Sequence, residues 1–396
     1  MSRPFRLRSL LAGGFAVALL HTGAFAADGA APAAPTAKPK IASVLGSVEV
    51  TVFDLPIEDN SPSGPMEVLG NDRFLFVTAC GDGLFMKRSG DTLATEATFS
   101  LNTVAKEAKR EPVFCEGNGS GVKDSVIIDG KLYLAHHVFD FSDNKAYMVV
   151  REFVIGEKGL TFSREILRVT PGVNEPYMGL QSGGRMAYDG RSLLIALGDF
   201  GKPRLTREDG SLLGKLVRVN LKTLKHEVVS AGLRSPTGGL FHDAETGLTW
   251  ETEHGPRGGD EINLIKPGKH YGWPEVSYGT NYEREGYGDY YGNNFNTHEN
   301  YEKPRYVFVP SIGIGTLAKY PKTGPIEYWH GDYFMAGMAT NTLYRVRIEG
   351  DRVVYVEPVM EGFRIRDIAI GKDGVIYMKT DDARLVISDS KKPATP

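Results

Sequence analysis

The sequence contains only two cysteines, Cys80 and Cys115, among 396 residues. It has no Cys-x-x-Cys pair, which argues against a zinc ribbon and against c-type haem attachment. Long periodic helical stretches are also absent, and the best helical candidate, residues 102–110, is short. Beyond the N-terminal region no segment approaches 20 apolar residues, so we predict no membrane-spanning helix there.

An excess of charge of either sign is absent as well. The 46 Lys and Arg residues nearly balance the 49 Asp and Glu residues, which leaves a net charge of −3. The sequence shows neither a basic stripe nor a basic amphipathic segment. We therefore expect no nucleic-acid partner and no binding to a membrane surface.

The two cysteines lie at the ends of strand-type runs, in Thr78-Ala79-Cys80-Gly81 and Val113-Phe114-Cys115-Glu116. A single pair of this kind often forms a bridge in an oxidising compartment. We predict a disulfide. The alternative is two separate buried thiols, since cysteine is often buried without a partner.

The first 26 residues are typical of a secretory signal peptide. A head with three arginines precedes a short apolar run at residues 10–20, and Ala24-Phe25-Ala26 supplies a small-residue cleavage site. The alternative is an N-terminal membrane anchor. We expect secretion through this signal and a periplasmic location.

The rest of the chain divides into three parts. Residues 27–40 are rich in Ala, Pro and Lys and form a predicted linker, because such a composition cannot bury a core. We assign residues 41–388 to one folded domain and residues 389–396 to a tail. About 350 residues is long for one compact domain but normal for a closed β architecture built from repeats.

Short strand-type runs dominate the folded part, and each follows a Gly- or Asx-containing turn signal of the kind that tight hairpins need. The runs are Arg73–Thr78, Lys131–Leu134, Ser192–Leu197, Gly247–Thr252, Asp332–Ala336 and Val375–Lys379. The first four turn signals recur roughly 55 to 60 residues apart, and a Tyr/Gly/Asn-rich insertion at 278–301 delays the fifth. Six such units predict an all-β, six-bladed β-propeller. The alternatives are a pair of β-sandwiches and a β-helix.

The most unusual stretch runs from Gly232 to Pro274 and contains the loop 253–261. Pro256 and the following glycines force an irregular backbone there, which turns carbonyl groups toward a ligand or an ion. Asp260 and Glu261 add oxygen ligands that suit a hard cation such as calcium. The alternative is a stiff surface turn with a local salt bridge.

This stretch resembles the glucose/sorbosone dehydrogenase family, which are periplasmic six-bladed propellers that use pyrroloquinoline quinone and calcium to oxidise sugars. The likeness is dense over 232–279 and looser but collinear over 179–220 and from 310 to the C-terminus. It implies that the carbonyls of Gly255 and Pro256 hold the calcium of the cofactor. Glu261 and the residue ten positions on, Tyr271, match a pair near a structural calcium in some members.

The resemblance also implies a quinone site whose polar residues are altered. Arg234 matches the arginine that lies over the quinone, but the family's Arg-Asn-Pro-Gln reads Arg234-Ser235-Pro236-Thr237 here. A Lys/Arg pair that meets the quinone's carboxylates in the family aligns with Thr340 and Asn341. Arg364 and Arg366 remain as cationic partners for those carboxylates.

Gln181 stands where the family has the histidine that acts as general base. An amide has no basic lone pair at neutral pH, so it binds a hydroxyl without taking its proton. The loss of a positioned base typically costs about 10²–10⁴-fold in rate. His136, His137 and His254 are other candidate bases, although a lone histidine at a strand end is usually packed or solvated.

Three hypotheses follow. The first is a quinoprotein sugar or alcohol dehydrogenase with an altered base. The second is a propeller without catalytic activity that binds a sugar, a glycan or a protein partner. The third is another enzyme at the same mouth, such as a calcium-dependent lactonase or hydrolase. Because the base and several polar partners are replaced together, we expect weak or absent quinone binding, whereas calcium remains a candidate ligand.

Overall fold

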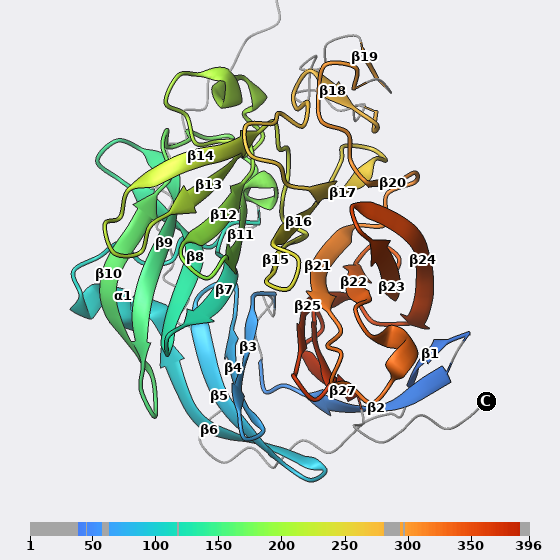
Figure 1. Cartoon of the computed structure of the whole chain (residues 1–396). Coiled ribbons are helices and arrows are strands. Elements are labelled where there is room, and N and C mark those ends of the chain that lie inside the picture. The colour runs from blue at the N-terminus through green and yellow to red at the C-terminus, as the bar shows by residue number, and fades with distance from the viewer. Residues whose placement is uncertain are drawn as a thin grey trace, which may run out of the picture.

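The computed structural model describes residues 39–44, 46–57, 63–116, 119–280, 294–295 and 298–388. Six antiparallel sheets surround a central axis, with strands β3, β7, β11, β15, β21 and β25 innermost (Figure 1). The prediction of an all-β, six-bladed propeller is confirmed. The proposed signal peptide, the tail and residues 281–293 of the Tyr-rich insertion lie outside the described residues, as does almost all of the proposed linker.

The first three blades each consist of four strands that are consecutive in sequence. Blade 1 holds β3 (Met66–Gly70), β4 (Arg73–Val77), β5 (Asp82–Ser89) and β6 (Thr92–Ser100). Blade 2 holds β7 (Val122–Ile128), β8 (Lys131–Asp140), β9 (Lys145–Ile155) and β10 (Leu160–Arg168). Blade 3 holds β11 (Gly183–Tyr188), β12 (Leu193–Leu197), β13 (Lys215–Val219) and β14 (His226–Ala231).

The last three blades contain the insertion and the closure. Blade 4 holds β15 (Gly239–Asp243), β16 (Leu248–Glu253), β17 (Asp260–Leu264) and β20 (Tyr306–Phe308), while β18 (Val276–Ser277) pairs with β19 (Asn294–Phe295). Blade 5 holds β21 (Ile314–Lys319), β22 (Tyr333–Gly337), β23 (Thr342–Glu349) and β24 (Arg352–Glu361). Blade 6 holds β25 (Ile365–Ile370), β26 (Ile376–Thr380), β27 (Arg384–Ser388), β2 (Gly46–Asp54) and β1 (Lys40–Ser43).

Each of the six turn signals falls between the first and second strands of a blade, and each predicted run is a second strand. Asp129 and Gly130 show why these residue types occur there, because their φ angles are +49° and +75°. Such angles are easily adopted only by Gly and Asx residues and match the twist of a two-residue hairpin. The second strands are apolar because both of their faces are covered by neighbouring blades; β12, for example, is buried throughout.

The ring closes where β2 pairs with β27, from Val50 opposite Ser388 to Asp54 opposite Arg384. An N-terminal strand thus completes the sheet that the C-terminal strands begin. This pairing leaves neither β2 nor β27 as an open sheet edge. Apolar side chains fill the space between adjacent blades, as where Met148 and Val150 of blade 2 join one cluster with Ile195 and Leu197 of blade 3.

Helical structure is scarce. Helix α1 (Leu101–Glu107) corresponds to the short predicted helix, and three single-turn 3-10 segments, η1 (Gly179–Gln181), η2 (Pro203–Arg207) and η3 (Glu327–Trp329), occur in loops. Within the described ranges, no helix has the length and apolar character that crossing a membrane requires.

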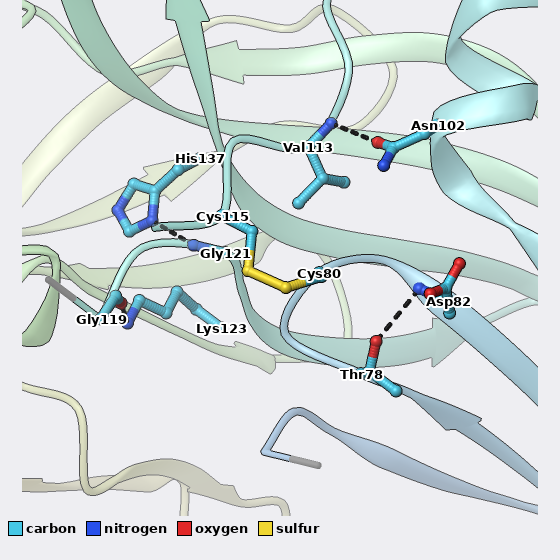
Figure 2. The surroundings of a disulfide bond; sticks show 10 residues. All are labelled: Thr78, Cys80, Asp82, Asn102, Val113, Cys115, Gly119, Gly121, Lys123 and His137. Atoms are coloured by element: carbon cyan, nitrogen blue, oxygen red, sulfur yellow. Dashed lines mark hydrogen bonds between the residues drawn. A yellow bond between two sulfur atoms is a disulfide. The ribbon is translucent and has the colours of Figure 1, made fainter. Parts of the chain in front are cut away.

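Cys80 and Cys115 form a disulfide with their Cα atoms 5.1 Å apart, which confirms the predicted bridge (Figure 2). Cys80 lies in the loop between β4 and β5, and Cys115 lies between α1 and β7. The bridge therefore ties a loop of blade 1 to the segment that leads into blade 2. Gly121 of this segment donates its amide hydrogen to Nδ1 of His137 on β8, at 3.0 Å.

Breaking this bridge should lower the free energy of unfolding by about 2–4 kcal/mol, because it closes a loop between residues 35 positions apart. Urea unfolding of the wild type with and without dithiothreitol, and of the double variant Cys80→Ser/Cys115→Ser, measures the effect. We expect the reduced wild type to have the same free energy of unfolding as the variant. Dithiothreitol should not change the free energy of unfolding of the variant. Equal stability of the oxidised and reduced wild type would contradict this account.

Candidate functional site

Four loops of blades 3 and 4 meet at one mouth of the central channel. The amide of Asp199 donates to the carbonyl of Arg234 at 3.0 Å, that of Phe200 donates to Gln181 at 3.2 Å, and that of His254 donates to Ser235 at 3.0 Å. These bonds join the η1 loop, the loop after β12, the loop before β15 and the loop after β16.

Two glycines allow this close approach. A Cβ atom on Gly198 would lie 1.9 Å from the carbonyl oxygen of Gln181, and one on Gly255 would lie 2.2 Å from that of Gly259. Any larger residue would push the loops apart. The irregular backbone predicted around Pro256 is therefore present, and it is packed against its own loop.

Arg234 lies at the centre of the mouth. Its Nη1 donates to the carbonyl oxygens of His254 and Gly255, at 3.0 and 2.9 Å. Its guanidinium also stacks over the ring of Trp273, 5.2 Å from the ring centroid. The side chain is 6% exposed, so the cation is held inside the protein by carbonyl dipoles and an aromatic face.

Glu253 holds the backbone on either side of this cation. Its Oε2 accepts from the amide of Arg234 at 2.6 Å and from that of Ser235 at 3.1 Å. Burial raises the pKa of Glu253 to about 7, although the two amides and the Arg234 charge favour the ionised form. The carboxyl group is therefore fixed by backbone donors and is not presented to a ligand.

Gln181 bridges the arginine and a buried acid. With its amide nitrogen facing the carboxylate, it donates to Oδ1 of Asp199 at 2.9 Å and accepts from Nη2 of Arg234 at 3.1 Å. The opposite orientation would place the amide oxygen against the carboxylate and the nitrogen against the guanidinium. The residue predicted at the base position is thus a neutral group with both ends engaged.

Asp199 and Trp273 belong to the same cluster, and sequence reasoning missed both. Asp199 is 0% exposed and accepts from the amide of Gly201 and from Nε1 of Trp273, each at 2.7 Å. Burial raises the pKa of Asp199 to about 6, against the lowering effect of Arg234. A signal existed, because a Gly-Asp pair that directly follows a fully apolar strand places a carboxyl group at a strand end.

A second acidic group surrounds Asn263. The Nδ2 atom of Asn263 donates to Glu251, Glu253 and Glu261 at 3.1, 3.3 and 3.3 Å. Burial, followed by the charge of Glu253, raises the pKa of both Glu251 and Glu261 well above the ordinary value. Three glutamates this close together cannot all be ionised without a high energetic cost, so the cluster is partly protonated at neutral pH.

The residues predicted to bind metal gather in part around a small pocket. Gly255, Glu261 and Tyr271 line it together with Glu253 and Trp273, and it has room for about one water-sized body. The hydroxyl of Tyr271 donates to the carbonyl of Leu264 at 2.5 Å, so a backbone group already engages it. Across the described ranges, no group of three or more His, Cys, Asp or Glu residues has an arrangement suited to a metal ion.

Ser235 lies beside the η1 loop, and Thr237 follows it in the same loop. Their hydroxyl oxygens are 3.4 Å apart, and the Ser235 hydroxyl donates to the carbonyl of Leu180 at 3.4 Å. These hydrogen bonds are long, so each hydroxyl can still form a shorter hydrogen bond with another group. Leu180 itself is 60% exposed.

Arg364 and Arg366 lie on the opposite side of the channel and share one carboxylate. Asp381 accepts from Nε of Arg364 at 2.9 Å and from Nε and Nη2 of Arg366 at 2.6 Å each. Nη1 of Arg364 also donates to the carbonyl of Met338 at 2.7 Å. Both predicted cations are therefore present at the channel, and both are already paired.

The histidines considered as replacement bases are bound to the backbone. Nε2 of His254 donates to the carbonyl of Ile314 at 2.6 Å, and Nδ1 of His136 donates to the carbonyl of His137 at 3.0 Å. Burial lowers the pKa of all three rings, that of His136 to about 3. His136 and His137 are also buried, at 2% and 0% exposed, and the ring of His137 packs edge-on against that of Phe200.

Comparison with known proteins gives this arrangement a family. The family model described as Glucose / Sorbosone dehydrogenase matches residues 75–387. The chain belongs to this family. The aldose sugar dehydrogenase YliI of Escherichia coli (strain K12) is 30% identical over 244 residues, which cover 57% of this chain and 62% of that protein. The quinoprotein glucose dehydrogenase B of Acinetobacter calcoaceticus is 29% identical over 146 residues, or 34% of this chain and 28% of that protein.

The match thus spans less than two thirds of the length of these curated relatives. Solved structures superpose over more of the chain. A glucose dehydrogenase at 27% identity has a TM-score of 0.70 over 85% of this chain and 99% of that one. The apo-form of the soluble aldose sugar dehydrogenase of Escherichia coli has a TM-score of 0.69 over 86% and 100% at 23% identity, a likeness that shows the fold alone.

The residues present do not fit the calcium and quinone of the family in the arrangement described. Arg234 donates to the carbonyl of Gly255, which the resemblance assigns to calcium, so a divalent cation there would lie next to a guanidinium. Arg364 and Arg366, the expected partners of the quinone's carboxylates, are both paired with Asp381. Other protein groups therefore already occupy the carbonyl and the guanidinium groups that would bind the cofactor.

Glu251→Gln should make stability less dependent on pH. The folded state holds the Glu251 proton above the ordinary pKa of 4.5, so the wild type loses stability as the pH rises from about 4.5. As the pH rises above 4.5, denaturant unfolding should show the variant gaining on the wild type by up to about 1.4 kcal/mol for each pH unit over which Glu251 stays protonated in the folded state. Glu107→Gln, on the exposed side of α1, is the control. If the wild type instead became more stable as the pH rose, and EDTA removed that added stability, a bound cation would be shown to hold the glutamate cluster together.

Proposed function

We propose that this chain is an exported, sugar-dehydrogenase-like propeller that binds a sugar or a related polyhydroxy ligand at the Arg234 mouth without oxidising it. Its membership of the family supports the ligand class. The absence of oxidation depends on one observation, the fixed position of Gln181 between Asp199 and Arg234.

Oxidation of a CH–OH group requires a base for the hydroxyl proton as hydride leaves the carbon. The amide of Gln181 cannot take that proton. The carboxylate of Asp199 has a suitably raised pKa, but it is 0% exposed and its oxygens accept from Gly201 and Trp273. Glu253 is held in the same way by two backbone amides. The mouth therefore lacks an accessible carboxylate base within the described residues.

The mouth keeps groups that suit a sugar. Thr237 is half-buried and offers a hydroxyl whose present bonds are long, and the exposed side chain of Leu180 adds an apolar surface on the neighbouring η1 loop. Sugar sites combine polar groups that fix orientation with apolar surfaces that pack against the ring. Binding without turnover needs these features and no base.

The Cys80–Cys115 disulfide supports an extracytoplasmic location, because such bridges persist in oxidising compartments. The N-terminal segment has the composition of a secretory signal. We therefore place the protein in the periplasm.

A slow quinoprotein dehydrogenase is the second candidate, and the retained Gly255-Pro256 loop and Arg234 favour it. The two candidates differ in how the Gln181→His variant behaves. If only the base is missing, the histidine should increase turnover about 10²–10⁴-fold. If the cofactor site is also filled by protein groups, as we propose, the histidine alone changes nothing.

We expect the wild type to bind at least one of a panel of aldoses and sugar acids in calorimetric titrations. We expect dye reduction with pyrroloquinoline quinone and calcium to stay at background for the wild type, for Gln181→His and for the matched control Gln181→Asn. An active dehydrogenase of the family serves as the positive control. Turnover by Gln181→His alone would establish the second candidate, and failure to bind any sugar would overturn the proposed function.

A further inference from the structure

Lys123 is a cation of the central channel without an acidic partner. It lies on the innermost strand β7, and its Nζ donates to the carbonyl of Gly119 at 2.6 Å, on the segment that the disulfide ties to blade 1 (Figure 2). Its amine forms no ion pair with any residue in the described ranges. The side chain is only partly exposed, so water does not solvate it fully.

The neighbours of Lys123 are also positive. Arg185 lies on β11 and Arg366 on β25, and both strands are innermost in their blades. Burial, followed by the charges of Arg366 and Arg185, lowers the pKa of Lys123 to about 7. Three strands of three blades thus bring three cations toward one part of the channel.

Lys123 differs from the two arginines in its pairing. Arg185 donates to Asp124 at 3.1 Å, and Arg366 forms a two-pronged contact with Asp381. Each guanidinium therefore has a carboxylate of its own, whereas the ammonium has only a carbonyl. A partly buried, unpaired charge is unfavourable unless a counterion compensates it.

This cationic group is continuous with the mouth. Nε of Arg185 donates to the carbonyl of Thr237 at 2.9 Å, and Thr237 belongs to the Arg234 loop. Burial, then the charge of Arg234 and lastly that of Arg366 lower the pKa of His254, in the loop that follows β16. Gly119 packs against Leu180, since a Cβ atom there would lie 2.5 Å from that side chain. The segments that carry Lys123 and Arg185 therefore contact the loops of the mouth.

We propose that Lys123 binds the carboxylate of an acidic sugar, with Arg185 and Arg366 adding positive charge beside it, so that the mouth selects sugar acids over neutral sugars. This inference rests on the proposed function and names its substrate class. A carboxylate suits Lys123 because its amine contacts only the carbonyl of Gly119 among the described residues, and charge-assisted bonds are about twice as strong as neutral ones.

Calorimetric titration with D-glucuronate and D-glucose tests the proposal. We expect the wild type to bind glucuronate at least about tenfold more tightly than glucose, because glucuronate gains a charge-assisted bond to Lys123 that glucose lacks. Lys123→Gln should bring the two affinities together by weakening glucuronate only. Lys123→Arg should keep the preference, and Lys225→Gln, at an exposed turn, is the surface control.

Each other outcome overturns the proposal in a different way. Equal binding of both sugars, unchanged in Lys123→Gln, rejects the carboxylate site and leaves the proposed function standing. Tighter binding of D-glucose 6-phosphate than of glucuronate replaces the carboxylate by a phosphate. Binding of pyrroloquinoline quinone that needs Lys123, with neither sugar bound, assigns the site to the quinone and rejects the proposed function as well. Binding of none of these probes rejects both.

Discussion

The contacts of Arg234 are the constraint on which the site depends. Its guanidinium donates to the carbonyls of His254 and Gly255 and to Gln181, and its backbone amide donates to Glu253. One side chain thereby joins the η1 loop, the loop before β15 and the loop after β16. Because a buried guanidinium needs several acceptors, these loops are held at fixed distances, and the positions of the neighbouring acids follow from them.

This arrangement is the basis of the proposal that the chain has the family's fold without the family's reaction. The carbonyl oxygen that the resemblance assigns to calcium accepts a protein cation instead, and the position of the base holds an amide that the same cation engages. The two differences reinforce each other, since Gln181 and Gly255 are both bound by Arg234. Lys123 on β7 has only the carbonyl of Gly119 as a hydrogen-bond acceptor among the described residues, and we propose that the channel selects an anionic ligand there.

The fold was predictable because its signals are local. A pair such as Asp129-Gly130 specifies a hairpin by its own backbone preferences, and apolar runs such as 193–197 specify buried strands. The disulfide was predictable from two cysteines that each lie at the end of a strand-type run. The site was only partly predictable, because Asp199 and Trp273 are 74 residues apart, and Lys123 meets Arg366 only after six blades close into a ring. The spacing of residues along the sequence does not show which of these distant residues come into contact. The resemblance identified only the residues that match a motif of the family.

The most direct test of the central claim is the binding of pyrroloquinoline quinone by the wild type in saturating calcium, followed by thermal unfolding and calorimetry. If Arg234 and Asp381 already satisfy the groups that the cofactor needs, no heat of binding and no stabilisation should be seen. A ligand present at 100 times its dissociation constant would stabilise the folded state by about 2.7 kcal/mol. A stabilisation of that size that requires both calcium and the quinone would contradict the account, because it would show that Arg234 releases Gly255 when the cofactor arrives.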